Sequence, residues 1–395
     1  MIVGALIRIA AVISVCSGTL IAAIRYGVAS QAVIDDGPAR AIALTPNLPE
    51  ALVAQATSLM LAHRPVEAFL AARQAVLGQP YDVVALRIAA QAAKLLGRDA
   101  ESTALFRQAG GLGWRDPPTQ AWMIEDAARR GDVDEIMQRA DALERRQLFP
   151  ELTRPVFFAA FVDPRMRKAL VDRIGEQPSW RRSLFADMYE RLTVAQAAGF
   201  AAFLQDMAAQ GEPASPAEIA MFVDRLAKLQ LFDEAQRVRH EFLGVPFAQL
   251  TQTPFDGGFS RSASGSAAAS RTVFEWHIDG AATNAEIDDG GLRVTSGAGG
   301  VPLVAQMVLL TAGPHILRAQ VTTSPPMRDI AGWSISCLPG SERLPLSGPA
   351  GHGPTLALAM FDIPAGDMCR AQMLTLRSFA TVDGITATID NVAIH

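Results

Sequence analysis

Two cysteines, Cys337 and Cys369, are the residues whose type and spacing best fit a defined chemistry. Cys337 ends an alternating run just before a Leu-Pro-Gly turn, and Cys369 begins another run just after a loop. A disulfide between them would close a loop of about 33 residues and would need an oxidising compartment. We predict this disulfide, with two buried free thiols as the alternative.

Signatures of catalysis and metal binding are missing from the sequence. The six histidines are scattered, and there is no His-x-x-x-His pair, no Cys-x-x-Cys pair and no Gly-x-Ser-x-Gly motif. The adjacent carboxylates at 35–36 and 288–289 would point apart in an extended chain, so turn or capping roles are favoured over acid-base catalysis. The glycine-rich segment 296–300 follows a strand pattern but precedes no helix, which indicates a loop. We therefore expect no enzyme, no catalytic residue, no cofactor and no metal site.

Two tryptophans, Trp276 and Trp333, are candidates for stacking on a sugar ring. Trp276 alternates with Phe274, and Trp333 alternates with Ile335, which places both rings on apolar strand faces. Large aromatic side chains at this spacing usually face the interior. We predict that both rings belong to a core, with a glycan-binding platform as the alternative.

The composition limits the classes of partner. The chain has 395 residues, of which 50% are hydrophobic and 19% are charged, so two or three domains can each bury a core. A net charge of -5 and a pI near 5.7 argue against nucleic acid, whose phosphates need a basic surface. Alanine is abundant and nearly all positive charge is arginine, a usage typical of GC-rich bacterial genomes.

The N-terminal segment 1–30 has the character of a membrane anchor. Arg8 is the only charge between Ile2 and Ile24, and a helix over these residues would span roughly 34 Å, against a hydrocarbon core of about 30 Å. The alternatives are a cleaved signal peptide, for which 28–30 supply small residues, and a buried helix of a soluble protein. We expect a single-pass protein of the bacterial inner membrane with most of its chain in the periplasm, or a soluble periplasmic or secreted protein after cleavage.

A period of 34 residues runs through the first half of the chain. Pro46 and Pro80 are 34 residues apart, and His63, Gly97 and Gly131 repeat the same interval. This period defines the windows 49–82, 83–116 and 117–150. Small or apolar residues recur at matching offsets: Ala68, Ala72 and Ala75 in the first window, Ala90, Ser102, Phe106 and Ala109 in the second, and Ile136, Ala140 and Leu143 in the third. Small residues allow two antiparallel helices to approach closely, and a fixed period repeats that contact along a solenoid.

These windows resemble divergent tetratricopeptide repeats that lack the early pair of large aromatic residues, and 37–46 resembles the trailing helix of an incomplete unit. The resemblance implies an α-solenoid whose concave surface, lined by the first helix of each pair, binds a segment of a protein partner. Further helical patterns cover 157–162, 178–192, 193–211 and 215–244. We therefore predict a helical repeat domain over 31–244.

The C-terminal part has the pattern of a β-sandwich. Residues 245–270 are rich in Pro, Gly, Ser and Thr and predict a linker, and short alternating runs separated by turn residues follow over 271–395. The runs are 272–278, 291–297, 302–313, 315–324, 332–340, 355–361, 369–378 and 384–395. We expect an antiparallel sandwich whose first edge begins near 254.

The closing segment GITATIDNVAIH, 384–395, changes the phase of its alternation at 390–391, which predicts a β-bulge. This segment and PFDGGFS at 254–260 resemble the two ends of galactose-binding-like jelly rolls, a group that includes many carbohydrate-binding modules. The resemblance implies a jelly roll that binds glycan. Asp256 replaces the usual asparagine, and Ser260 stands where those modules often have a calcium-binding glutamate, so their structural calcium is not expected here.

The whole layout resembles tetratricopeptide proteins associated with bacterial exopolysaccharide synthesis and export. It predicts a multidomain α plus β protein with a transmembrane helix, an α-solenoid and a C-terminal sandwich. We expect an exported scaffold that binds a protein partner through its repeats and, as a further expectation, polysaccharide through its sandwich. The alternatives are a glycan-processing enzyme with an unrecognised site and a purely structural envelope protein.

Overall fold

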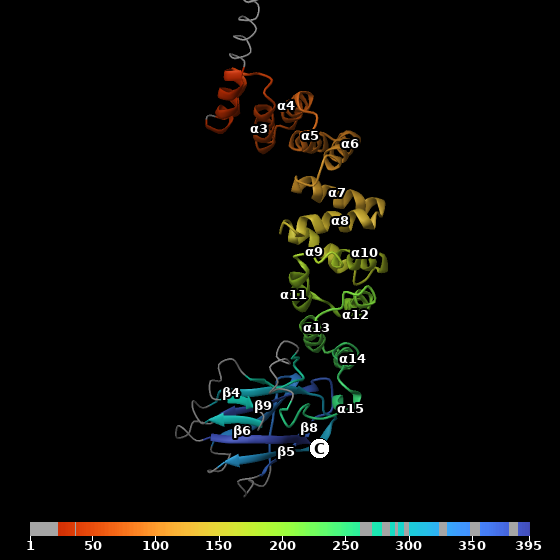
Figure 1. Cartoon of the computed structure of the whole chain (residues 1–395), viewed down its shortest axis with the longest axis vertical. Coiled ribbons are helices and arrows are strands. Elements are labelled where there is room, and N and C mark those ends of the chain that lie inside the picture. Colours follow the sequence, from red (N-terminus) through yellow and green to blue (C-terminus); the bar gives the residue numbers. More distant parts are fainter. Residues whose placement is uncertain are drawn as a thin grey trace, which may run out of the picture. The chain divides into compact units, whose positions relative to one another are not determined.

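The structure is a computed structural model that describes residues 23–35, 37–260, 271–278, 285–288, 291–295, 300–323, 330–347, 356–378 and 386–395. By their contacts the residues form two compact units, Met1–Ala159 and Ala160–His395. The described part of the first unit is helical, and that of the second contains helices followed by strands (Figure 1).

Pairs of helices repeat at a constant interval in the first unit. After a helix over 23–35, the elements are α2 (Pro38–Leu44), α3 (Pro49–Leu61), α4 (Pro65–Gly78), α5 (Val83–Leu95), α6 (Asp99–Gly111), α7 (Pro117–Arg130), α8 (Val133–Glu144) and α9 (Pro150–Ala159). The first helices α3, α5 and α7 begin 34 residues apart, and so do the second helices α4, α6 and α8. The predicted helical repeat and its three windows are confirmed.

The turn inside each helix pair has the same backbone conformation. His63, Gly97 and Gly131 have φ values of 57°, 74° and 69°, in the left-handed region. The N–H of Arg64 donates to the carbonyl of Leu59 at 2.9 Å, and equivalent bonds recur one and two repeats later. This geometry ends a helix and satisfies its last carbonyl groups, so the 34-residue spacing of these three residues marks the helix ends.

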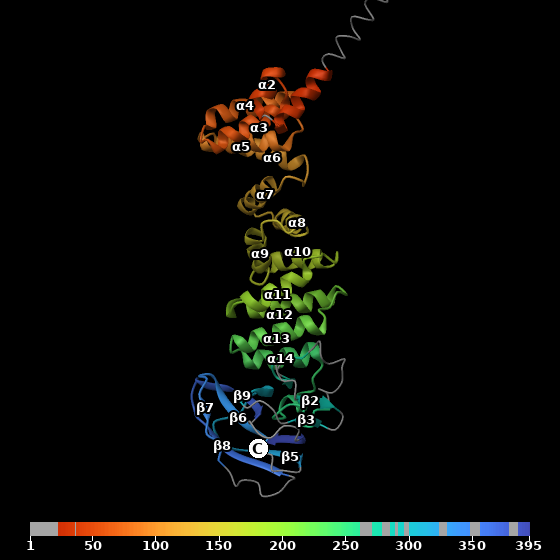
Figure 2. The ribbon, with the colours of Figure 1, turned by 90° about the vertical axis from the view of Figure 1, so that its left-hand side faces the viewer.

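Small residues bring the helices of the first unit together. Ala68, Ala72 and Ala75 of α4 have no exposed surface, and they pack with residues of α3 and α5 in buried clusters. Figure 2 shows α3, α4 and α5 lying next to one another. The alanines at the predicted offsets therefore form helix contacts, because a larger side chain would keep the helix axes apart.

The helices of the second unit pack around phenylalanine side chains. They are α10 (Pro164–Ile174), α11 (Arg181–Arg191), α12 (Val194–Ala209), α13 (Pro216–Lys228), α14 (Phe232–Leu243) and α15 (Phe247–Leu250). The Phe200 ring lies 4.8 Å from the Phe161 ring and 4.7 Å from the Phe222 ring, measured between centroids. Gly199 is required at this contact, since a Cβ there would lie 1.7 Å from the Phe161 carbonyl oxygen.

Two sheets follow these helices in the second unit, and all the pairings between their described strands are antiparallel. One sheet has the order β1 (His277–Ile278), β4 (Pro302–Val308), β9 (Cys369–Ser378), β6 (Ala331–Pro339) and β7 (Arg343–Leu344); the other has the order β2 (Ala285–Asp288), β3 (Gly291–Thr295), β10 (Thr386–Ile394), β5 (Gly313–Thr323) and β8 (Leu356–Ile363). Buried residues of both sheets, such as Leu374 and Ile389, share one core cluster. The predicted antiparallel sandwich is confirmed at this level.

The closing strand contains the predicted bulge. The register of β10 on β5 shifts between Asp390 and Ala393, and Asn391 has a φ of 49°. Because of this shift, Ile389 and Val392 both reach the core cluster although strict alternation would separate them.

The segment before the sandwich packs against this closing strand. The N–H of Val392 donates to the carbonyl of Gly257 at 2.8 Å, and a Cβ at Gly257 would lie 1.9 Å from the Val392 carbonyl oxygen. Phe259 has no exposed surface and belongs to the core cluster. Gly257 and Phe259, which lie in the predicted linker, are therefore part of the packed structure. The domain bounds of 1–30, 31–244, 245–270 and 271–395 stay a prediction.

A buried arginine joins α14 to the start of the sandwich. Arg239 is 1% exposed, its guanidinium lies 4.7 Å from the Phe255 ring and 5.1 Å from the Phe274 ring, and it donates to Glu275 at 2.6 Å. Glu275 also accepts the N–H of Thr272 at 2.6 Å. A guanidinium held between two rings and a carboxylate has little freedom, so this contact fixes α14 against the first strand region.

A second charged group, Asp224 of α13, faces the same segment. Its carboxylate accepts the N–H of Val273 at 2.7 Å. Burial raises the pKa of Asp224 to about 6, although this hydrogen bond and the nearby His277 favour the ionised form. At neutral pH the chain therefore holds a costly buried charge at this contact.

Candidate functional site

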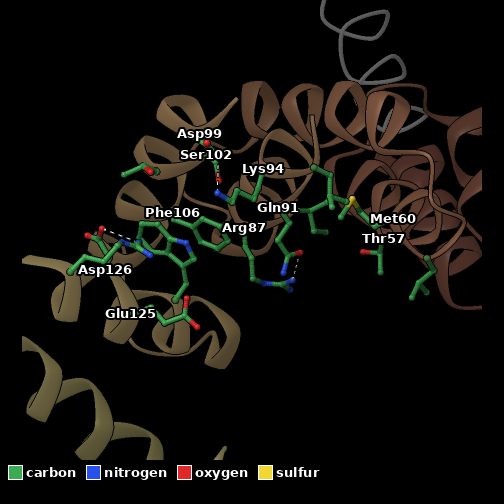
Figure 3. Close-up of a pocket in the computed structure, with 16 residues that line it drawn as sticks. Thr57, Met60, Arg87, Gln91, Lys94, Asp99, Ser102, Phe106, Glu125 and Asp126 are labelled. Carbon is green, nitrogen blue, oxygen red and sulfur yellow. Dashed lines mark hydrogen bonds and ion pairs between the residues drawn. The ribbon is translucent and has the colours of Figure 1, made fainter. Parts of the chain in front are cut away.

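The first unit has a groove of about 940 Å³, which we call the repeat groove. It is lined by Thr57, Met60, Leu61, Arg87, Ile88, Gln91, Lys94, Leu95, Asp99, Ser102, Thr103, Phe106, Trp122, Glu125, Asp126 and Arg129. Figure 3 shows Thr57 and Met60 at one end, Glu125 and Asp126 at the other, and Arg87 and Gln91 between them.

The repeat groove uses the same helical positions of three successive first helices. Thr57, Gln91 and Glu125 are spaced by 34 residues on α3, α5 and α7. The residues four positions later, Leu61, Leu95 and Arg129, are spaced in the same way and lie on the same helix faces. The first helices therefore contribute a row of equivalent positions, and the second helix α6 contributes Asp99, Ser102, Thr103 and Phe106.

The two ends of the repeat groove differ in polarity. At the α3 and α5 end, the Leu61 and Leu95 side chains are 78% and 64% exposed. At the α7 end, the row changes to Glu125 and Arg129. Leu61 and Leu95 line one groove at equivalent positions, and a contiguous apolar surface of this kind is typical of a protein-binding surface.

A stack of planar groups forms the α7 end. The rings of Phe106 and Trp122 lie 4.5 Å apart with an angle of 8° between their planes. The Arg129 guanidinium lies 5.5 Å from the Trp122 ring centroid. Stacking on the Trp122 ring restricts the orientation of this guanidinium, so its N–H donors are pre-oriented for a planar acceptor such as a carboxylate.

Three arginines converge on one carboxylate beside this stack. Asp126, whose side chain is 4% exposed, accepts from Arg107 at 2.9 Å and from Arg129 and Arg130 at 3.3 Å each. Burial opposes ionisation of Asp126, but the three guanidinium groups outweigh it and lower its pKa below the usual range. Asp126 therefore stays ionised and holds the arginines in place.

The other carboxylates of the repeat groove do not form a catalytic pair. Asp99 pairs with Lys94 at 2.7 Å, and Arg87 pairs with Asp116 at 2.8 Å. Glu125 is exposed, whereas its neighbour Asp126 is buried. Adjacent residues of a helix do not face each other, so these two carboxyl groups point apart. Glycoside hydrolysis generally uses two carboxyl groups that flank one glycosidic bond.

The predicted cysteine pair lies within one sheet. The Sγ atoms of Cys337 and Cys369 form a disulfide between β6 and β9, with 4.5 Å between the Cα atoms. Both residues are buried, at 2% and 6% exposure.

The predicted tryptophans both face the interior of the sandwich. Trp276 has no exposed surface and donates through Nε1 to the Asp256 carbonyl at 2.9 Å. Trp333 is partly buried and packs against the same core cluster, with its ring centroid 6.1 Å from that of Trp276. The Trp276 ring therefore presents no face on which a sugar could stack.

Asp256 and Ser260, which correspond to calcium-site positions of galactose-binding-like jelly rolls, are joined by a hydrogen bond. The Ser260 hydroxyl donates to the Asp256 carboxylate at 3.0 Å. Within the described ranges, no group of three or more histidine, cysteine or acidic residues is arranged to hold a metal ion.

The predicted membrane anchor falls mostly on residues 1–22, which lie outside the described residues. Among the residues that the structure describes, we find no helix with the length and apolar character of a membrane span.

Comparison with known proteins leaves the family unassigned. No protein-family model matches the chain, and no curated protein matches it. Among solved structures, the chain is similar to PilW, a widely conserved type IV pilus biogenesis factor, at 14% sequence identity and a TM-score of 0.26. The match covers 51% of this chain and 96% of that chain. A similarity at this level assigns neither fold nor function, so the proposals below depend on the repeat groove.

Sequence reasoning found the surface but missed its charged end. The 34-residue period predicted a surface lined by first helices, and the structure identified positions 57, 91 and 125 on it. Arg129 and Arg130 stand three and four residues after Asp126, a local helix signal. Nothing in the sequence indicated that Arg107 of α6 would reach the same carboxylate.

Proposed function

We propose that this chain is a non-catalytic scaffold whose repeat groove holds a segment of a protein partner. The observation that carries the proposal is the row of equivalent positions on α3, α5 and α7, with Leu61 and Leu95 largely exposed. Stacked helix pairs that present such a row bind extended or helical segments.

Co-purification of the full chain from its own cells tests this proposal. The Leu61→Asp and Leu95→Asp double variant places two charges in the apolar end of the groove, and we expect it to lose the bound partner. Leu77→Asp is the matched control, since Leu77 of α4 is 79% exposed and does not line the groove. Equal recovery of the partner with the wild-type chain, the double variant and Leu77→Asp would contradict the proposal.

We further propose that the chain works outside the cytoplasm, anchored to the bacterial inner membrane by its N-terminal segment or released after its cleavage. The apolar stretch before Arg25 and the disulfide support this location. Reporter fusions at residue 245 test it: an export-dependent reporter should be active there, and an active cytoplasmic-type reporter would reject the orientation.

We also propose that the sandwich binds glycan and that the scaffold takes part in envelope or exopolysaccharide assembly. The support for glycan binding is the resemblance to galactose-binding-like jelly rolls and a polar row on the outer face of the second sheet. In this row Arg293 of β3 is paired in register with Thr388 of β10, which is paired with Thr322 of β5. Retention of the full chain on immobilised polysaccharide from the source cells, and its loss in Arg293→Ala, test this role.

A further inference from the structure

The repeat groove also limits the chemistry of its occupant. Resting on the proposed function, we infer that the partner segment combines large apolar side chains with a carboxylate. The apolar side chains contact Leu61 and Leu95. The carboxylate approaches Arg129, which lines the groove, and Arg107, which does not line it but binds the same Asp126 carboxylate.

The apolar requirement follows from the floor and rim of the groove. Leu61 and Leu95 end their helices with most of their surface in water, and Ile88 and Met60 lie beside them. Covering two such leucines removes apolar area from water, which is the main favourable term in association. A segment without large apolar side chains would leave this area uncovered.

The requirement for a carboxylate follows from an excess of guanidinium groups at Asp126. Among the described residues, Asp126 is the carboxylate that pairs with Arg107 and with Arg129, whereas Arg130 also pairs with Asp132 at 3.1 Å and Glu135 at 2.5 Å. Arg107 and Arg129 thus share one negative charge between them. Their side chains are 51% and 58% exposed, so donors remain accessible to a partner.

The remaining cations of the groove are already matched. Arg87 and Asp116 are 18% and 10% exposed and pair one to one, and Lys94 pairs one to one with Asp99. A partner carboxylate therefore gains most at Arg107 and Arg129. Glu125, which is exposed and pairs with no cation among the described residues, opposes the approach of a negative group.

Selection of peptides by the full chain tests the inference. The probe is a displayed library of random peptides of about 12 residues, long enough to cross the three first helices. Peptides that also bind the Leu61→Asp and Leu95→Asp double variant are discarded, so that those kept depend on the groove. We expect the kept peptides to be enriched in leucine, isoleucine, phenylalanine or methionine together with aspartate or glutamate.

Synthetic versions of the kept peptides then measure the charge contact by fluorescence anisotropy. Replacing the acidic residue by its amide should weaken binding to the wild-type chain by about tenfold, the loss expected for one charge-assisted hydrogen bond. Arg129→Gln should weaken the acidic peptide to the same extent and leave the amide peptide unchanged. Glu125→Gln should strengthen the acidic peptide by about twofold to threefold, since it removes a like charge without touching the buried pairs.

Arg73→Gln is the control for the loss of one positive charge, because Arg73 is exposed on α4 and does not line the groove. Kept peptides enriched in lysine or arginine, or an amide peptide that binds as well as its acid, would overturn the inference and leave groove binding intact. Failure to recover any groove-dependent peptide would overturn the proposed function as well.

Discussion

Two clusters of arginine and carboxylate differ in how far water reaches them. Around Asp126 the carboxylate is buried, but the side chains of Arg107 and Arg129 are more than half exposed. Around Glu275 the arginine itself is buried, since Arg239 is 1% exposed and lies against two phenylalanine rings. The first cluster keeps donors for a partner, whereas the second has its charges enclosed within one unit. Breaking the enclosed cluster should therefore reduce stability, and breaking the exposed one should reduce binding.

The largest expected effect comes from Arg239→Met. The change leaves the carboxylate of Glu275, whose side chain is 14% exposed, without its guanidinium. Removing one partner of a buried pair costs about 3–5 kcal/mol, so we expect a loss of this size in the free energy of unfolding. Urea unfolding followed by tryptophan fluorescence measures it, and Arg239→Met combined with Glu275→Gln should recover part of the loss. A loss below about 1 kcal/mol would show that the cluster does not hold the unit together.

The disulfide should contribute nearly as much to the same unit. Cys337 and Cys369 are separated by 32 residues. Closing a loop of this length stabilises the folded state by about 3–4 kcal/mol in the chain-entropy model. We expect Cys337→Ser with Cys369→Ser to lower the free energy of unfolding by this amount. Mass spectrometry after alkylation under non-reducing conditions should find both cysteines unalkylated in the wild-type chain. Alkylation of both cysteines would contradict the disulfide.

An intermediate effect of opposite sign is expected for Asp224→Asn. The folded-state pKa of Asp224, about 6, lies above the unfolded value of 3.8. The stability that its bound proton contributes is complete below pH 3.8, falls as pH rises and is lost above about 6. Asparagine avoids the buried charge and still accepts the Val273 N–H. At pH 7 we therefore expect the free energy of unfolding of the variant to exceed that of the wild type by about 1–3 kcal/mol.

The pH dependence of this difference is the control for Asp224. Glu275, His277 and Lys228 also face Asp224, and all three are present in both the variant and the wild type. The difference should shrink to near zero at pH 4. A difference that stays constant from pH 4 to pH 7 would contradict the assigned cause.

The smallest effect on stability is expected for Arg129→Gln in the exposed cluster. Asp126 keeps Arg107 and Arg130, and Arg129 is largely exposed, so the free energy of unfolding should change by less than about 1 kcal/mol. Thermal unfolding measures this. A loss as large as that of Arg239→Met would remove the distinction between the two clusters.

Much of the fold follows from local sequence patterns. The 34-residue spacing of His63, Gly97 and Gly131 marks the helix ends because each residue adopts the left-handed conformation. The sandwich runs were predicted from alternation, and the phase change at 390–391 marks the bulge. These features are local, since each depends on the conformation of a few neighbouring residues.

Other elements could not be read in this way. The helix α10 was not predicted, and the pattern over 215–244 was continuous although the chain breaks at Gln230, whose φ is 60°. Glutamine is not a usual residue for that conformation, so no stop signal was visible. The short strands β2 and β7 were also missed. The run 272–278 contributes only its last two residues to a strand.

The charged clusters differ in the same respect. Arg129 and Arg130 are helix neighbours of Asp126, but Arg107 comes from another helix. Arg239 and Glu275 are 36 residues apart on opposite sides of the predicted linker. Contacts of this kind depend on how elements pack, and a single sequence contains no periodic signal for them.

Photo-cross-linking in the source cells tests directly whether the repeat groove holds a protein partner. A photoreactive amino acid replaces Gln91, in the middle of the groove, or Arg73, on an exposed face outside it. We expect position 91 of the full chain to give a cross-linked protein of defined mass and position 73 to give none. The Leu61→Asp and Leu95→Asp double variant should abolish the product. An equal product from both positions, or one that persists in the double leucine variant, would contradict the proposal.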